Sequence, residues 1–288
     1  MQIGCRTDVG RKRQLNEDSV MTHKFDAIFP SSLETGALFV VADGMGGHNA
    51  GEIASELGVR VFASECLRRL IVKSDKVTII DNRLINKFTV QDIFDQAIQS
   101  ANEAVAQQAQ EQGLQGMGTT IVAALIIGQN MYITNVGDSR CYLINGREIT
   151  QITRDHSLVQ EMADAGMITP EEAMTHPRRN EITRAIGAYP EITGDFYFCK
   201  LYEGDTILLC SDGLTSMLPE QKIAEITLNA ASPDQACNDL IAMANEAGGI
   251  DNITVIVVRP GQLPSLTDII ASDTEISQMP VTEIEYRQ

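Results

Sequence analysis

Two blocks of apolar β-type runs and two pairs of helical segments constrain the fold of this chain more than any other feature. Residues 1–42 are predicted to form strands, most clearly at 20–29 and 37–42, where β-branched, aromatic and other apolar residues gather. Similar runs predict further strands at residues 119–127, 130–136, 140–144, 194–201, 206–210 and 252–258. Apolar residues at helical spacing predict helices over residues 50–70, 90–112, 219–229 and 233–247. Segments grouped in this way are typical of an α+β layered sandwich rather than of an alternating parallel sheet.

Three segments depart from this pattern. Residues 71–89 form a connection of ambiguous structure. Residues 157–191 are polar and contain three prolines, which predicts short helical pieces in an excursion from the core. Residues 261–288 are polar and acidic, so we expect a disordered or loosely packed tail after a domain formed by residues 1–260.

Charge and cysteine content exclude several classes of protein. The 288 residues include 22 basic and 39 acidic side chains, and the net charge of −17 argues against a nucleic-acid-binding surface. Six scattered cysteines without a C-x-x-C pair indicate reduced thiols in a cytoplasmic protein. No signal peptide is recognisable, and the longest apolar stretch, residues 119–127, is too short to cross a membrane. We therefore expect a cytoplasmic protein with no membrane or nucleic-acid partner.

Four aspartates stand where an apolar run meets turn residues: Asp43, Asp138, Asp212 and Asp251. The first three follow a predicted strand at a tight turn, and the fourth precedes one. Carboxylates gathered at one edge of a sheet pair repel each other unless a cation lies among them, and oxygen-only ligands favour Mg²⁺ or Mn²⁺. A glycine after Asp43 and after Asp212 lets the backbone approach such an ion. The alternative is ordinary turn chemistry, in which Asp-Gly pairs are common.

The N-terminal stretch over residues 7–18 adds a basic side chain near a further aspartate. Arg13 offers a rigid fork of donors that suits a phosphate dianion, and Asp18 is a further metal-ligand candidate. A solvated loop arginine is the alternative interpretation.

Several motifs, taken in their order along the chain, resemble those of one family. The motifs are T-D-V-G-R-K-R-Q-L-N-E-D (7–18), V-V-A-D-G-M-G-G-H (40–48), G-M-G-T-T and N-V-G-D-S-R (within 116–140), T-R-D-H-S (153–157), L-L-C-S-D-G-L (208–214) and D-N-I-T-V-I (251–256). Over residues 1–260 the chain resembles the bacterial form of the metal-dependent protein phosphatases, the PPM or protein phosphatase 2C type. The resemblance implies a four-layer αββα sandwich of two antiparallel sheets flanked by helix pairs, with the metal site at one end and a flap at about 157–191.

The resemblance also implies a ligand set for two Mn²⁺ or Mg²⁺ ions. Asp43 would bridge both metals, and Gly44 would be a ligand through its carbonyl oxygen. Asp212 and Asp251 would bind the first metal, and Asp18 would hold waters of the second.

A mechanism for phosphoserine and phosphothreonine hydrolysis follows from the same resemblance. A hydroxide that bridges the two metals would attack phosphorus in line, while the metals and Arg13, the matching phosphate-binding residue, would offset the charge on the phosphate oxygens. Asp138, with Asp212, resembles the third-metal site of bacterial members.

The identity of the general acid stays open. The eukaryotic pattern has a histidine directly after D-G, whereas this chain has Met45 there and His48 three residues later. His48 and a metal-bound water are therefore alternatives. His156 fits a structural role better, at the entry to the flap.

Two other functions remain as alternatives. The first is a catalytically dead phosphatase fold that acts as a regulatory or phosphoprotein-binding module. The second is a hydrolase of small phosphoesters. By analogy with the family we expect a monomer whose partners are phosphorylated protein substrates, with a cognate Ser/Thr kinase and its targets.

Overall fold

The structure is a computed structural model that describes residues 1–25, 36–46, 50–71, 87–146 and 148–261. Its strands are β1 (Gln2–Asp8), β2 (Asp18–Phe25), β3 (Gly36–Met45), β4 (Gly118–Thr119), β5 (Ile121–Ile127), β6 (Asn130–Val136), β7 (Arg140–Asn145), β8 (Glu148–Gln151), β9 (Asp195–Lys200), β10 (Thr206–Cys210) and β11 (Ile253–Arg259). Its helices are α1 (Ala50–Ile71), α2 (Lys87–Gln112), α3 (Leu158–Asp164), α4 (Pro170–Thr175), α5 (Asp212–Thr215), α6 (Glu220–Asn229) and α7 (Pro233–Glu246).

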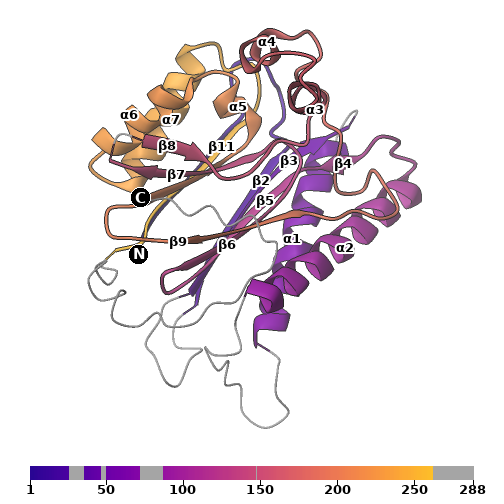
Figure 1. The fold of residues 1–288 in the computed structure, drawn as a ribbon. Helices are drawn as coiled ribbons and strands as arrows, with labels where there is room; N and C mark the ends of the chain where they lie inside the picture. The colour runs from indigo at the N-terminus through magenta and orange to yellow at the C-terminus, as the bar shows by residue number, and fades with distance from the viewer. Residues whose placement is uncertain (26–35, 47–49, 72–86, 147, 262–288) are drawn as a thin grey trace.

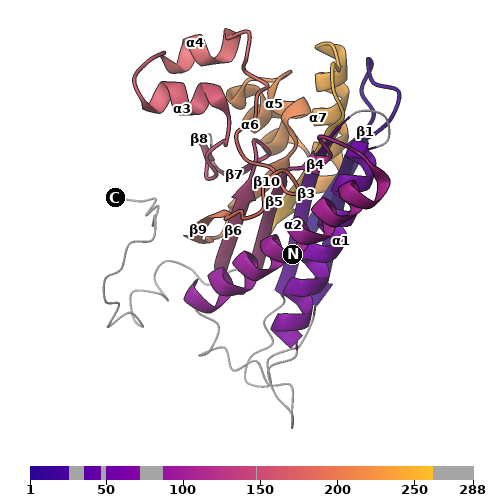
Figure 2. The ribbon, with the colours of Figure 1, turned by 90° about the vertical axis from the view of Figure 1, so that its right-hand side faces the viewer.

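The strands form two antiparallel sheets (Figure 1). One sheet has the order β1-β11-β10-β7-β8, and the other has the order β2-β3-β5-β6-β9 with β4 paired to β3. The first strand, β1, pairs along its whole length with the last, β11. Helices α1 and α2 lie side by side on one sheet, and α6 and α7 cover the other (Figures 1 and 2). The four layers confirm the predicted αββα sandwich.

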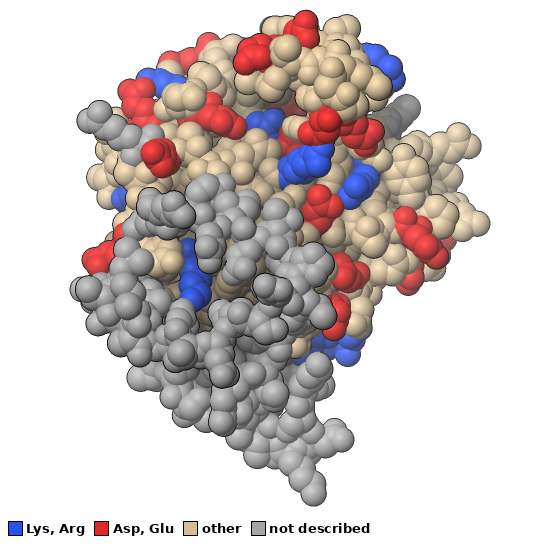
Figure 3. Space-filling view, viewed as in Figure 1, with Lys and Arg blue, Asp and Glu red and all other residues tan. Residues whose placement is uncertain are grey.

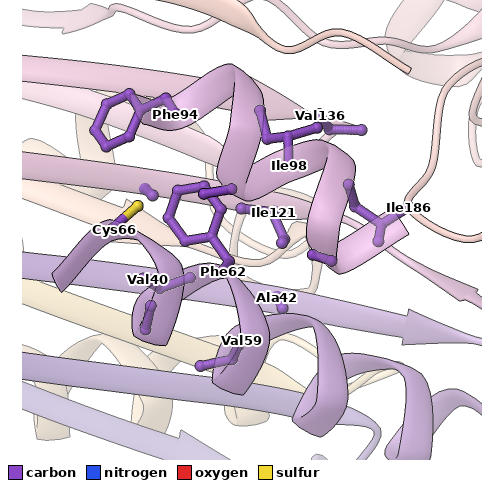
Figure 4. Packing of buried hydrophobic residues seen from close by; sticks show 14 of the residues in the cluster. Val40, Ala42, Val59, Phe62, Cys66, Phe94, Ile98, Ile121, Val136 and Ile186 are labelled. Carbon is purple, nitrogen blue, oxygen red and sulfur yellow. The ribbon is translucent and has the colours of Figure 1, made fainter. Parts of the chain in front are cut away.

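Three apolar clusters hold the layers together. The first packs α1 and α2 against their sheet, and its members include Phe62 of α1, Phe94 of α2, Val40 of β3 and Ile121 of β5 (Figure 4). The second lies between the two sheets, and the third lies under α6 and α7. Strand β3 shows how one segment serves two clusters. Alternate side chains of a strand point to opposite faces, so Leu38 and Val40 face the helices while Phe39 and Val41 face the other sheet.

Most predicted elements are confirmed within a few residues, and the differences have local causes. Strand β8 and helix α5 were not predicted, because each has only four residues and no apolar period to reveal it. Residues 157–191 contain the short helices α3 and α4, as predicted. Most of the connection at 71–89 and nearly all of the tail at 261–288 lie outside the described residues.

Candidate active site

Five aspartates come together at one end of the sandwich, the upper end in Figure 1. Asp18 begins β2 and is the register partner of Asp43 on β3. Asp138 lies in the turn between β6 and β7. In the other sheet Asp212 follows β10, and Asp251 precedes β11, the antiparallel neighbour of β10. The site is therefore shared by both sheets.

Asp43 does not lie in a turn, so that part of the prediction is wrong. It lies inside β3, because β4 extends the ladder by pairing with Gly44 and Met45 beyond it. The amide of Asp43 donates to Thr120 Oγ1, and its carbonyl oxygen accepts from the amide of Thr120 and the hydroxyl of Thr119. These bonds fix the backbone that carries the carboxylate.

The glycines after Asp43 and Asp212 permit close packing of protein backbone around the site. A Cβ atom on Gly44 would lie 2.0 Å from the carbonyl oxygen of Gly51 in the first turn of α1, and one on Gly213 would lie 2.0 Å from the carbonyl oxygen of Asn252. A side chain at either position would push apart the segments that carry the aspartates.

Burial and mutual repulsion raise the pKa values of four of these carboxyl groups. For Asp43 the pKa is raised well above its usual value, first by burial and then by Asp18 and Asp212. Burial and Asp212 likewise raise the pKa of Asp138. Burial raises the pKa of Asp18 to about 7, and burial with the charge of Asp251 raises that of Asp212 to about 6. Such a group of carboxylates is stabilised by protons or by a cation.

The donor set fits divalent cations, although the carboxylates are not already assembled around a common point. Oδ1 of Asp18 and Oδ1 of Asp212 are buried and accept no hydrogen bond from the described residues. Buried carboxylate oxygens without donors are costly, and a hard cation is the group that oxygen ligands suit. No cage of three or more His, Cys, Asp or Glu side chains is preformed within the described ranges.

Sequence reasoning missed the polar side chains that hold the aspartates. Ser211 donates from its hydroxyl to Asp18 Oδ2 at 2.7 Å and accepts from the amide of Thr254. Asn252 accepts from the amide of Glu17 at 2.7 Å and donates to the carbonyl oxygen of Leu15. A single polar residue inside an apolar strand motif, such as the serine in L-L-C-S-D-G-L, is the sequence signal that could have predicted such a partner.

Arg13 lies at the mouth of this site. Its Nη2 donates to Asp251 Oδ2 at 2.8 Å, and its Nη1 lies 3.8 Å from Glu17 Oε2. The side chain is 47% exposed, so its remaining donors can reach a ligand from solvent. The amides of Arg11 and Lys12 donate to the carbonyl oxygen of Gly249, which holds the loop against the segment that carries Asp251.

Of the two histidines considered, only His156 lies in the described part of the chain. Its buried Nδ1 accepts from the amide of Gly137, next to Asp138, and its Nε2 lies 3.3 Å from Asp195 Oδ2. The ring thus holds the β6–β7 turn, whereas the role expected from the sequence was to position the chain at the entry to the flap. His48, the candidate general acid, lies outside the described residues.

The excursion that contains α3 and α4 is joined to a site-bearing segment in its later part, where Ile186 forms an isolated bridge with Thr119. A second bridge, between Ser157 and Ile182, lies within the excursion and holds its beginning against that later part. Arg178 forms a bidentate ion pair with Glu181 at 2.6 Å for each contact, and both side chains are more than half exposed. Arg179 is also exposed.

Comparison with known proteins decides the family. Residues 19–243 match the family model described as Protein phosphatase 2C. The serine/threonine phosphatase stp of Listeria monocytogenes is 39% identical over 260 residues, 90% of this chain and 96% of the relative. The chain belongs to the protein phosphatase 2C family. It is a metal-dependent serine/threonine protein phosphatase, which confirms the predicted family, enzyme class and general function.

Solved structures of this family agree with the fold. The serine/threonine phosphatase of S. agalactiae superposes with a TM-score of 0.76 at 36% identity, covering 89% of this chain and 98% of that one. The catalytic domain of the phosphatase PstP in complex with 2 manganese ions has a TM-score of 0.69 at 34% identity, covering 89% and 96%. Among the described residues no helix is both long and apolar enough to cross a lipid bilayer.

Proposed function

We propose that this phosphatase hydrolyses phosphoserine and phosphothreonine in proteins at the aspartate cluster, with two divalent cations held by this chain's own ligands. Asp43 would contact both ions, with the Gly44 carbonyl oxygen, Asp212 and Asp251 completing the ligand set and Asp18 binding through water. The observation that carries the proposal is the pair of buried, donor-free oxygens on Asp18 and Asp212 beside carboxyls with raised pKa values. When bound, the ions supply an activated water and neutralise phosphate charge.

The remaining residues would orient the reactants. Ser211 and Thr120 fix the segments that carry Asp18 and Asp43, so the ligands keep their geometry during turnover. Arg13 would bind two oxygens of the phosphate with its guanidinium fork and stabilise the charge that gathers there in the transition state. His48 stays a candidate for the group that protonates the departing serine or threonine oxygen.

Two finer assignments belong to the same proposal. Asp138 with Asp212 would hold a third cation; the support is that Asp212 is the charge that most raises the pKa of Asp138. The protein would act in the cytoplasm on targets of a cognate Ser/Thr kinase. The support for that location is that all six cysteines are free thiols.

The test is release of phosphate from a phosphothreonine peptide, with a nucleoside monophosphate as a second substrate. After chelation with EDTA and dialysis, activity should be absent, and added Mn²⁺ should restore it on the peptide. Activity that survives dialysis in EDTA would contradict the metal-based mechanism. Preference for the nucleotide would favour the small-phosphoester alternative instead. Metal binding without turnover of either substrate would favour the regulatory module.

A further inference from the structure

We propose that a groove beside the metal site binds an apolar side chain of the phosphoprotein, close in sequence to the phosphorylated residue. This rests on the proposed function, because it assigns part of the substrate to that same site. The groove has a volume of about 480 Å³ and is open to solvent. Its walls are the last turn of α2, the loop that follows, the end of β3 and the segment after Ile186.

The lining of the groove is apolar or uncharged. Met45, Leu114 and Met117 contribute the larger apolar surfaces, Ala109 and Ala188 the smaller ones, and Gln115 lies at the exposed rim. No charged side chain is among the described residues that line it, in a chain with 39 acidic residues. Methionine side chains adapt their shape to different apolar partners. The lining therefore suits an aliphatic or aromatic side chain and gives a charged one no partner.

Two short segments of the chain connect residues that line the groove to the active site. Met45 follows Asp43 by two residues on β3, a distance of about 7 Å along a strand. Met117 is followed by Gly118, which pairs with Met45, and by Thr119 and Thr120, which hydrogen-bond to Asp43. When the phosphorylated residue of a substrate lies at the metal site, the substrate residues one to three positions away from it therefore lie over the groove.

One wall is held in place before any substrate arrives. Ile186 is fully buried in the cluster under α1 and α2 (Figure 4), and its amide and carbonyl pair with Thr119. The buried side chain of Asn102 accepts from the amide of Gly187 at 2.7 Å and donates to the carbonyl oxygen of Tyr189 at 2.8 Å. Tyr189 itself is 51% exposed beside the rim. Binding a side chain here thus requires little ordering of the protein, which favours affinity.

The first measurement uses the intact wild-type enzyme with Mn²⁺. Phosphothreonine peptides of one neutral sequence carry Leu, Glu or Lys at a single position from three before to three after the phosphoresidue. We expect one position at which Leu exceeds Glu in kcat/KM by on the order of tenfold, since part of the Leu surface leaves water. Equal rates for Leu, Glu and Lys at every position would overturn the groove assignment and leave the phosphatase function standing. Absence of Mn²⁺-dependent release from every peptide would overturn the function and this inference with it.

The second measurement uses matched variants to test whether the preference for Leu in the peptide arises at the groove. Gln115→Lys should raise the Glu-to-Leu ratio of kcat/KM at that position several-fold, and Gln115→Glu should raise the Lys-to-Leu ratio, because each adds a charge at the rim. Ala188→Phe should lower the preference for Leu by filling the groove. Rates are normalised to aryl phosphate hydrolysis by the same variant. The controls are Gln221→Lys and Gln221→Glu on the exposed face of α6, in the opposite helix layer. Ratios that move equally in the controls, or in none of the variants, would overturn the assignment.

Discussion

Asp251 and Arg13 contact each other across the site, so a proposed metal ligand is paired with the proposed phosphate-binding residue. The guanidinium has five donors, and the pair occupies only part of that capacity. Its half-exposed position lets the other donors meet a phosphate that approaches from solvent. Replacing Arg13 therefore tests phosphate binding separately from metal binding by Asp251.

Arg13→Ala should lower kcat/KM for a phosphopeptide. The loss should correspond to about 2–4 kcal/mol of transition-state stabilisation, which is the cost of removing one preorganised donor. Mn²⁺ affinity, measured by calorimetry, should not fall, because the ligand oxygens stay in place. Arg13→Lys is the control, since it keeps the charge and loses the fork. A collapse of Mn²⁺ binding in Arg13→Ala would show that the side chain has a structural role instead.

Asp43→Asn and Asp212→Asn test the ligands. Each should reduce Mn²⁺ binding and lower turnover by more than about 100-fold, the upper range for losing a residue that only supports a ligand. Calorimetry and phosphopeptide release measure the two effects. Circular dichroism should show an intact fold, because removing one charge also relieves repulsion among the carboxylates. Wild-type turnover in either variant would contradict the ligand assignment.

Among the elements, the excursion formed by residues 157–191 is joined to β4, beside the site, by the bridge between Ile186 and Thr119. Its helix α4 has no buried residue, and Met167 and Met174 are 72% and 75% exposed. An element with so few core contacts is suited to contacting a partner rather than to supporting the core.

Arg178→Ala and Arg179→Ala should therefore change the discrimination among phosphopeptides. Arg178 is paired with Glu181, so we expect the larger effect from Arg179, which forms no ion pair with any of the described residues. Hydrolysis of a minimal aryl phosphate should stay nearly unchanged, because that substrate reaches only the metals and Arg13. The measurement is kcat/KM for two phosphopeptides and one aryl phosphate. Parallel losses on all three would mean that the segment supports the fold.

The long elements and the aspartates could be predicted from sequence because their signals are local. Apolar residues at helical spacing reveal α2, and a continuous apolar run reveals β5, without knowledge of any partner. The bond from Ser211 to Asp18 joins residues 193 positions apart, and β4 extends β3 only because residues 118–119 return to it. Such features depend on tertiary contacts, which a single sequence does not display. The family motifs supplied the residue roles that local patterns left open.

At the scale of the whole molecule, the site makes stability depend on pH. In the metal-free protein the pKa values are about 7 for Asp18 and about 6 for Asp212, against about 3.9 in an unfolded chain. Between about pH 4 and about pH 7 the folded state therefore holds more protons than the unfolded state, and the free energy of unfolding falls as pH rises. Urea unfolding in EDTA should show a decrease on the order of a few kcal/mol across this window.

Two further measurements check the cause of this dependence. Saturating Mn²⁺ should raise the free energy of unfolding most at pH 7, where the carboxylates are least protonated and bind cations best. Asp18→Asn should flatten the curve in EDTA, because it removes one titrating group. Stability that rises with pH in the metal-free wild type would contradict the assignment of raised pKa values to this site.

The pairing of β1 with β11 determines how late in synthesis this sheet can be completed. A ribosome makes β1 (Gln2–Asp8) long before the strand that pairs with it, which is β11 (Ile253–Arg259). At about 5–20 residues per second, β1 waits roughly 10–50 s for this partner during synthesis. Asp251, a proposed metal ligand, is made just before that strand, so the proposed ligand set is incomplete throughout this wait. We therefore expect a nascent chain that ends before Asp251 to release no phosphate from a phosphopeptide.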